Sequence, residues 1–216
     1  MSTRDNILKR IRAANGRSAE ASFQEEQIAG RRMRSHDRGP LPTMDWEPVP
    51  RFKERCIAMQ STLDEIGTMA ELPAAIARYL KENSLPGSGV CWPELSGLPW
   101  QAAGLSVDAR PSNGDDKVGI TGCFCAIAET GSLMMLSGEN WHATTSLLPE
   151  THIAVVPQSR VLRAMEDGWD LLRREHNALP RQVNFISGPS RTADIEMTLV
   201  LGAHGPFRVH IVLLKS

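Results

Sequence analysis

The run from Val118 to Leu136 constrains the fold most, because it places two short apolar segments on either side of Ala128-Glu129-Thr130-Gly131. We interpret the run as two buried strands joined by a polar turn. Gly131 permits backbone angles that strain other residues, and Glu129 and Thr130 are the groups in the turn that could do strong polar chemistry. The turn is therefore the first candidate site, although a Glu beside a Gly is equally typical of an ordinary turn.

Apolar strands and helical patterns alternate over much of the remaining chain. The continuous apolar run Thr151–Pro157 is typical of a strand buried on both faces. Helical spacing from Val161 to Leu172 follows it, and short strands are expected at Val183–Ile186 and Phe207–Leu214. No Asn-Gly hairpin turn joins neighbouring strands late in the chain. These patterns predict an α/β fold with a mostly parallel sheet flanked by helices.

The first fifty residues differ in composition from the rest and predict an arm. Ser2-x-x-Asp5 resembles a capping box, so a short amphipathic helix should follow it. Residues 15–36 are polar and charged, and prolines at positions 40, 42, 48 and 50 disfavour continuous helix or central strand. We therefore predict an N-terminal helical and extended arm with a linker over 1–50 and one domain over 51–216. Trp46 is the residue expected to anchor the linker against the domain or a partner subunit.

Charge and hydropathy exclude some classes of partner. The formal net charge is −1, which gives no global reason to expect nucleic acid or an anionic membrane, although residues 1–55 are mildly basic. The sequence near residue 1 resembles no cleaved leader, and no apolar run approaches the roughly 20 residues of a membrane span. We expect a cytoplasmic protein.

The four cysteines, Cys56, Cys91, Cys123 and Cys125, do not have the spacing of a cluster-binding set. Cys123 and Cys125 would share a face of one strand and could reach one metal. No second Cys/His pair follows at a metal-binding spacing, however. We predict buried structural cysteines, no disulfides, and no metal or other cofactor in this chain.

Ligands of parallel sheets gather at the carboxyl ends of the strands, and we assign three loops to that edge. They are Glu129–Gly131, residues 187–194 and residues 204–206. In the middle loop the amides after Gly188 favour an anion, and Arg191 offers a forked donor for carboxylate or phosphate. Its predicted anion-binding residues are Gly188, Ser190, Arg191, Thr192 and Asp194, with Thr130 and Gly131 from the first loop. The alternative is that Arg191 merely pairs with Asp194.

Of His142, His152, His204 and His210, we expect His204 on a loop, between Gly202 and Gly205-Pro206, where it could orient a carboxylate or move a proton. His142, His152 and His210 are more typical of hydrogen-bonded structural residues. We predict that Glu129 and His204 act as catalytic residues and converge with Arg191 on one pocket at the carboxyl edge.

Several of these segments together resemble the LUD domain of the lactate-utilisation protein C family (LutC/YkgG). They are Ala128–Gly131, Leu148-Pro149-x-x-His152, the run Ser187–Glu196 and Gly202-x-His204-Gly205-Pro206. The likeness covers roughly residues 50–216. It implies a fold similar to the NagB/RpiA/CoA-transferase-like group. It also implies a part in oxidising L-lactate to pyruvate beside two companion proteins that hold iron–sulfur centres.

Two functional hypotheses follow. In the first, the chain is the cluster-free subunit of a lactate-oxidising complex and contributes a pocket for a small carboxylate or phosphate, with a homo-oligomer through the arm also possible. In the second, a CoA-transferase-like or sugar-phosphate-handling enzyme uses Glu129 as nucleophile or base. We favour the first, because fold likeness alone is only an analogy for chemistry.

Overall fold

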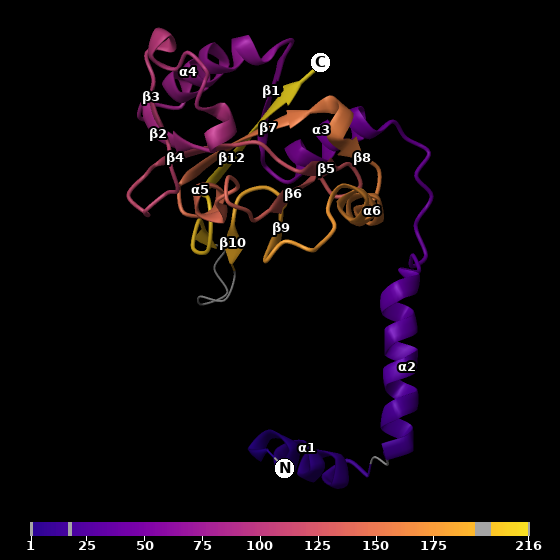
Figure 1. Cartoon of the computed structure of the whole chain (residues 1–216). Helices are drawn as coiled ribbons and strands as arrows, with labels where there is room; N and C mark the ends of the chain where they lie inside the picture. The colour runs from indigo at the N-terminus through magenta and orange to yellow at the C-terminus, as the bar shows by residue number, and fades with distance from the viewer. Residues whose placement is uncertain (1, 17–18, 193–199, 216) are drawn as a thin grey trace. The chain divides into compact units, whose positions relative to one another are not determined.

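The computed structural model describes residues 2–16, 19–192 and 200–215 (Figure 1). The chain forms two compact units, Met1–Thr43 and Met44–Ser216. In the described residues, no helix is both long enough and apolar enough to cross a membrane.

The first unit contains two helices, α1 (Thr3–Ala14) and α2 (Ala19–Ser35). The predicted capping box is present at α1, where Ser2 and Asp5 exchange hydrogen bonds. The second helix was not predicted, because its apolar residues are too sparse to form a buried stripe. Its Ala, Glu, Gln and Arg residues nevertheless have high helix propensity, and its apolar side chains Phe23, Ile28 and Met33 are exposed.

A six-stranded sheet organises the second unit, in the order β1-β12-β7-β4-β2-β3, and every neighbouring pair is parallel. Its strands are β1 (Thr62–Ile66), β2 (Ser88–Cys91), β3 (Ser106–Ala109), β4 (Val118–Thr121), β7 (Thr151–Pro157) and β12 (Arg208–Leu214). The predicted α/β class with a mostly parallel sheet is thus confirmed.

Alternate residues of the central strands enter different cores. Ile153 and Val155 of β7 pack with helix α4 (Leu72–Glu82) on one face. Ala154 and Val156 pack on the other face, against α3 (Pro48–Ala58) and a second sheet. This explains the continuous apolar run of β7, since both of its faces are covered. The connections on the α4 side include the short 3-10 turns η1 (Met69–Glu71), η2 (Pro93–Leu95) and η3 (Gln101–Ala103).

The second sheet has four strands in the order β8-β5-β6-β9. Its strands are β5 (Cys125–Ile127), β6 (Ser132–Leu136), β8 (Val161–Leu162) and β9 (Val183–Ile186). The stretch from 118 to 136 therefore forms three strands rather than the predicted two, with β4 in one sheet and the antiparallel pair β5–β6 in the other. The chain changes sheet over residues 122–124. Periodicity could not reveal this break, because both sides of it are buried and apolar.

Helix α6 (Met165–Glu175) covers the outer face of the second sheet. The predicted helix from Val161 begins four residues later, because Val161 and Leu162 pair with β5. Gly168 lets α6 approach closely, since a Cβ there would lie 3.1 Å from both Ile127 Cδ1 and Met134 Sδ. A glycine that weakens the helix locally thus permits its packing.

Trp46 anchors the segment before α3, as predicted. The Arg163 guanidinium lies 5.4 Å from the centre of the Trp46 ring and donates to the carbonyl oxygens of Met44 and Trp46. Trp46 also packs against the core between the two sheets. Helix α3 begins at Pro48, three residues before the position expected for the start of the domain.

His152 and His210 are buried structural residues, as predicted. A hydrogen bond of 2.8 Å joins His152 Nε2 to Thr121 Oγ1, and His210 Nδ1 lies 2.9 Å from Thr62 Oγ1. His210 also stacks on the ring of Tyr79. Burial lowers the pKa of each histidine from 6.5 to about 4, so both imidazoles are neutral near pH 7.

Candidate functional site

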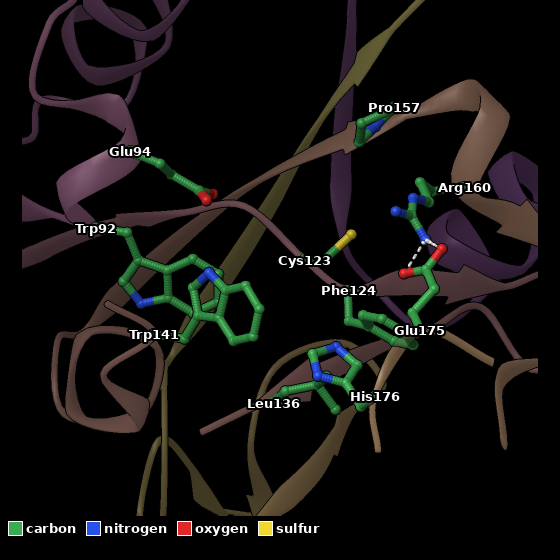
Figure 2. Close-up of a pocket in the computed structure, with 10 residues that line it drawn as sticks. All are labelled: Trp92, Glu94, Cys123, Phe124, Leu136, Trp141, Pro157, Arg160, Glu175 and His176. Atoms are coloured by element: carbon green, nitrogen blue, oxygen red, sulfur yellow. Dashed lines mark hydrogen bonds and ion pairs between the residues drawn. The ribbon is translucent and has the colours of Figure 1, made fainter. Parts of the chain in front are cut away.

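A cavity of about 220 Å³ lies at the carboxyl ends of three adjacent strands, β2, β4 and β7. Residues after each of these strands line it, and the end of β6 and the end of α6 complete it (Figure 2). The lining residues are Trp92, Glu94, Cys123, Phe124, Leu136, Trp141, Pro157, Arg160, Glu175 and His176.

The position of this cavity follows from the order of the strands. From β2 the chain moves outward to β3, and it then returns to the other side of β2 to form β4, followed in the sheet by β7 and β12. The direction in which successive strands are added to the sheet therefore reverses between β2 and β4. Open α/β sheets place ligands outside the carboxyl ends of strands at such a switch point. Trp92 follows the last residue of β2, Cys123 lies two residues after the end of β4, and both side chains line the cavity.

Aromatic rings form much of the wall. The Trp92 ring is buried, and its Nε1 donates to the carbonyl oxygen of His142 at 3.1 Å. The His176 ring makes edge contacts with Phe124 and Trp141, with centroids 5.7 and 6.0 Å apart. Trp92 both packs against the core and faces the cavity. Trp100 is instead a core residue that donates to the Leu95 carbonyl.

Charged groups enter the cavity from two sides. Arg160 lies in the 3-10 turn η4 (Gln158–Arg160) after β7, and its Nη1 donates to both carboxylate oxygens of Glu175, at 2.8 and 2.9 Å. Glu94 follows β2, and its Oε1 lies 2.4 Å from where a Cβ on Gly122 would be. Figure 2 shows the Glu94 carboxylate and the Arg160 guanidinium on opposite sides of Cys123.

Cys123 contributes a neutral thiol. Burial raises its pKa well above the ordinary value of 9, Cys125 and Glu94 raise it further, and Arg160 opposes them. Cys125 points elsewhere, since its Sγ contacts Met134 Sδ at 3.6 Å in the layer beneath α6. The two thiols therefore do not form the shared pair considered from their spacing. In the described part of the chain, no three His, Cys, Asp or Glu side chains form a metal-binding group.

The turn Glu129–Gly131 lies in the second sheet, between β5 and β6. Gly131 has a positive φ of 71°, and a Cβ there would lie 2.8 Å from Arg55 Cβ on α3. The Glu129 amide donates to the Arg163 carbonyl oxygen at 3.0 Å. This turn is therefore not at the carboxyl edge of the parallel sheet, where it was predicted. A glycine is required there because α3 approaches the backbone.

The loop after β9 contacts the end of the same helix. Gly188 has a φ of 73°, and a Cβ there would lie 2.2 Å from the Met59 carbonyl oxygen. Arg191 Nη2 donates to that same oxygen at 2.9 Å. A chain of hydroxyl groups joins this loop to the first turn, from Thr130 Oγ1 through Ser132 Oγ to Ser187 Oγ. These bonds join the first and second predicted loops.

The third loop, which carries His204, lies at the opposite edge of the six-stranded sheet from the cavity. It precedes β12, whose first residue Arg208 pairs with Thr151 at the start of β7. The His204 amide lies 3.4 Å from Ser190 Oγ, and the Ser190 amide donates to Pro206, so this loop does meet the loop after β9. The prediction of one carboxyl-edge pocket is wrong, because loop 204–206 enters a strand rather than leaving one.

Among the described residues, no hydrogen bond or ion pair joins Glu129, Arg191 and His204 to one another. Thr192 is buried and pairs with Val200 in the short hairpin of β10 (Arg191–Thr192) and β11 (Val200–Leu201). Asp194 lies outside the described residues, so its pairing with Arg191 stays a prediction. The catalytic and anion-binding roles assigned to these loops also stay predictions.

Sequence reasoning missed most of the cavity's residues. Arg160 and Glu175 are 15 residues apart and meet only because α6 folds back along the second sheet. One signal in the sequence could have indicated the cavity. Trp92 and Cys123 follow apolar runs, and residues at the end of a strand can face a ligand.

The sequence profile of the LUD domain matches residues 93–214, which is more than half of the chain. The chain belongs to the LUD domain family. All of the cavity's residues except Trp92 lie within the matched range. The predicted resemblance is therefore confirmed.

Relatives within the LUD domain family support this assignment. A protein of Shouchella clausii named "Lactate utilization protein C" is 38% identical over 187 residues, which cover 79% of this chain and 80% of the relative. A protein of the same name from Bacillus subtilis is 39% identical over 102 residues, or 46% of this chain and 42% of the relative. The chain thus spans less than half the length of the B. subtilis relative.

A solved structure shows the same fold. The crystal structure of a DUF162 family protein from Deinococcus radiodurans superposes with a TM-score of 0.57 and covers 80% of this chain and 99% of that one. At 24% sequence identity, this match is evidence for the fold alone.

Proposed function

We propose that this chain takes part in lactate utilisation, as the cluster-free subunit of a system that oxidises L-lactate to pyruvate. The observation that carries the proposal is the 38% identity with the S. clausii protein over 79% of the chain. Two companion proteins complete the system, and at least one of them holds iron–sulfur clusters. These accept the two electrons that leave lactate on oxidation, because clusters of this kind carry electrons.

The environments of the cysteines support a cluster-free role. Cluster ligation requires thiolates, whereas burial raises the pKa of Cys56 and Cys125 to about 12 and that of Cys91 to about 11. Their positions are also separate. Cys56 contacts the Gly131 carbonyl oxygen, and Cys125 contacts Met134. The proposal therefore assigns the clusters to the partner proteins.

The cavity at the carboxyl edge is the site through which this subunit handles a small ligand. It combines an aromatic wall with a few convergent charged groups, which is the usual composition of a small-molecule site. Of the loops predicted from the sequence, the first two pack against α3 or its end, and the third bonds to Ser190.

Growth on L-lactate as the sole carbon source tests this function. A strain that lacks the chain should fail to grow, and the wild-type chain should restore growth. Arg160→Lys and Arg191→Lys then distinguish the two candidate sites, since each keeps the charge and removes the fork. We expect slow growth with Arg160→Lys and near-normal growth with Arg191→Lys, whose described bond to Met59 a lysine can replace.

The opposite result would move the site to the loops. Loss of growth with Arg191→Lys alone, in a protein that remains folded, would support the anion-binding role predicted for that residue. Normal growth of the strain without the chain, in the absence of a second copy, would contradict a role in lactate utilisation.

A further inference from the structure

We propose that the carboxyl-edge cavity binds a small monocarboxylate with a neighbouring hydroxyl group. Arg160 receives the carboxylate, and Glu94 accepts the hydroxyl hydrogen. This inference deepens the proposed function by naming a ligand class, and it rests on that function only for the choice of L-lactate as the first probe.

Arg160 is already oriented but keeps free donors. Only its Nη1 is bonded to Glu175, at 2.8 and 2.9 Å, and no described residue accepts from its Nη2 or Nε. Figure 2 shows the guanidinium beside Cys123 and Phe124, with its other nitrogens on the side of the cavity. The Phe124 ring centre lies 5.7 Å from Arg160 Cζ and adds a cation–π contact. Nη2 and Nε can thus form the two parallel bonds that a carboxylate accepts.

The charges around the cavity oppose a dianion more strongly than a monoanion. Arg160 is opposed by two carboxylates, Glu175 and Glu94, so these three side chains sum to −1 near pH 7. A phosphate ester with nearly two negative charges would be repelled by both carboxylates, whereas a monocarboxylate adds one charge directly at the guanidinium. The charge balance therefore selects a carboxylate over a phosphate.

The volume and walls limit the size of the ligand. A cavity of about 220 Å³ is smaller than the roughly 300–1,000 Å³ typical of pockets for drug-sized ligands, which suits a small organic acid. Trp92 is only 3% exposed, so one wall presents a fixed apolar surface. Displacing water from such a wall strengthens a charge-assisted hydrogen bond beside it.

Glu94 supplies the second polar contact. Its carboxylate lies over Gly122 and faces the cavity across from Arg160 (Figure 2). An ionised carboxylate only accepts hydrogen bonds, so it would bond to a hydroxyl group and repel a second carboxylate. A 2-hydroxy acid offers a bonding partner to each of the two groups, whereas acetate offers one only to Arg160.

Calorimetric titration of the purified full-length chain with L-lactate, acetate and inorganic phosphate tests this proposal. We expect saturable binding of L-lactate, weaker binding of acetate and no binding of phosphate. Arg160→Gln should weaken L-lactate binding about tenfold or more, because it removes a charged, forked donor. Arg173→Gln is the matched control, since Arg173 is equally exposed, lies on α6 and pairs with Asp170 outside the cavity. It should change the affinity less than about twofold.

Glu94→Met separates the two contacts. It keeps the length of the side chain but removes the acceptor, so the preference for L-lactate over acetate should fall about fivefold while acetate binds as well or better. Arg160→Lys gives a second test of the fork if Arg160→Gln does not fold.

Three results would overturn the proposal: no saturable carboxylate binding by the wild-type chain, equal L-lactate affinity in Arg160→Gln, or tighter binding of phosphate than of L-lactate. The growth assay remains separate from these outcomes. Loss of growth in the strain without the chain, together with absent carboxylate binding, would refute the ligand class and leave the proposed function standing.

Discussion

The two edges of the six-stranded sheet differ in what they contain. At the carboxyl edge, segments leaving β2, β4 and β7 surround a cavity with aromatic walls and an Arg160–Glu175 pair. At the amino edge, loops enter the strands and bond to one another. Lys117 pairs there with Glu150, and the Arg208 amide donates to the Glu150 carbonyl oxygen.

This difference shows that the direction of the chain decides which loops can form a site. A loop that leaves a parallel strand opens outward and can surround a ligand, whereas the loops described at the amino edge are held in place by their own bonds. Arg160 and Arg191 have similar chemistry but different surroundings. Arg160 lines a cavity, and Arg191 donates to the backbone of Met59.

The largest expected effect on stability comes from replacing Gly119 in β4, and Gly122 just after β4 gives the matching test at the carboxyl edge. A Cβ at Gly119 would lie 1.9 Å from the Thr145 carbonyl oxygen, in the backbone of helix α5 (Ala143–Leu147). Gly119→Ala should therefore destabilise the protein by about 4 kcal/mol or more. At Gly122 a Cβ would clash with the Glu94 side chain, which can move, and would make an ordinary contact of 3.8 Å with Trp92 Cε3. Gly122→Ala should therefore cost about 1 kcal/mol or less.

Urea unfolding of both variants measures this contrast. The Gly122→Ala protein should stay folded while losing preference for L-lactate over acetate, because Glu94 is displaced. Equal losses of stability in the two variants would show that the carboxyl edge is packed as rigidly as the amino edge.

Acid should weaken the amino half of the sheet first. His152 and His210 lie at the second and third positions of β7 and β12, and burial lowers the pKa of each from 6.5 to about 4. Between these pH values the unfolded chain binds more protons than the folded one, so the free energy of unfolding falls as the pH drops from 6.5 to 4. The loss for His152 alone should reach about 3 kcal/mol.

Unfolding in urea at pH 7.5, 6 and 5 measures this slope, and His152→Gln should make it shallower. Carboxylates with a lowered pKa, such as Glu65 and Asp116, lose their contribution mainly below their ordinary values of 4.5 and 3.8, so they add little to this slope. A stability that stays constant from pH 7.5 to 5 would show that the two imidazoles are reached by water.

The smallest effect is expected at Gln60, where the chain turns from α3 towards the amino end of β1. Gln60 is exposed and has a positive φ of 66°, a conformation that glycine adopts without strain. Gln60→Gly should therefore stabilise the protein by about 0.5 to 1 kcal/mol. The midpoint of thermal unfolding measures this, and ligand binding should not change. A destabilised variant would indicate that the Gln60 side chain makes a contact that offsets its strain.

The sequence predicted those parts of the fold that depend on local patterns. The apolar run of β7 predicted a doubly covered strand, and Ser2 with Asp5 predicted the start of α1. The second sheet could not be predicted in the same way, because β4 and β5 are separated by only three residues and both are fully buried. Which sheet a buried strand joins depends on its distant partners rather than on its own residues.

The site was less predictable for the same reason. Gly131 and Gly188 were taken to shape ligand loops, but both are needed because α3 and Met59 lie against them. Glycine is required wherever protein backbone or a ligand comes close to the chain, so the sequence alone does not distinguish the two cases. The roles of Arg160 and Glu175 depend on a pairing between η4 and the end of α6, which no short motif marks.

The place of β12 in the sheet has a consequence for how the protein is made. This strand lies between β1 and β7, and it joins β1 through contacts such as that of Thr62 with His210, 148 residues apart. During synthesis β1 emerges long before its only neighbour in the sheet. The sheet is therefore complete only after β12 has left the ribosome. Until then β1 and β7 expose unpaired edges that chaperones would recognise.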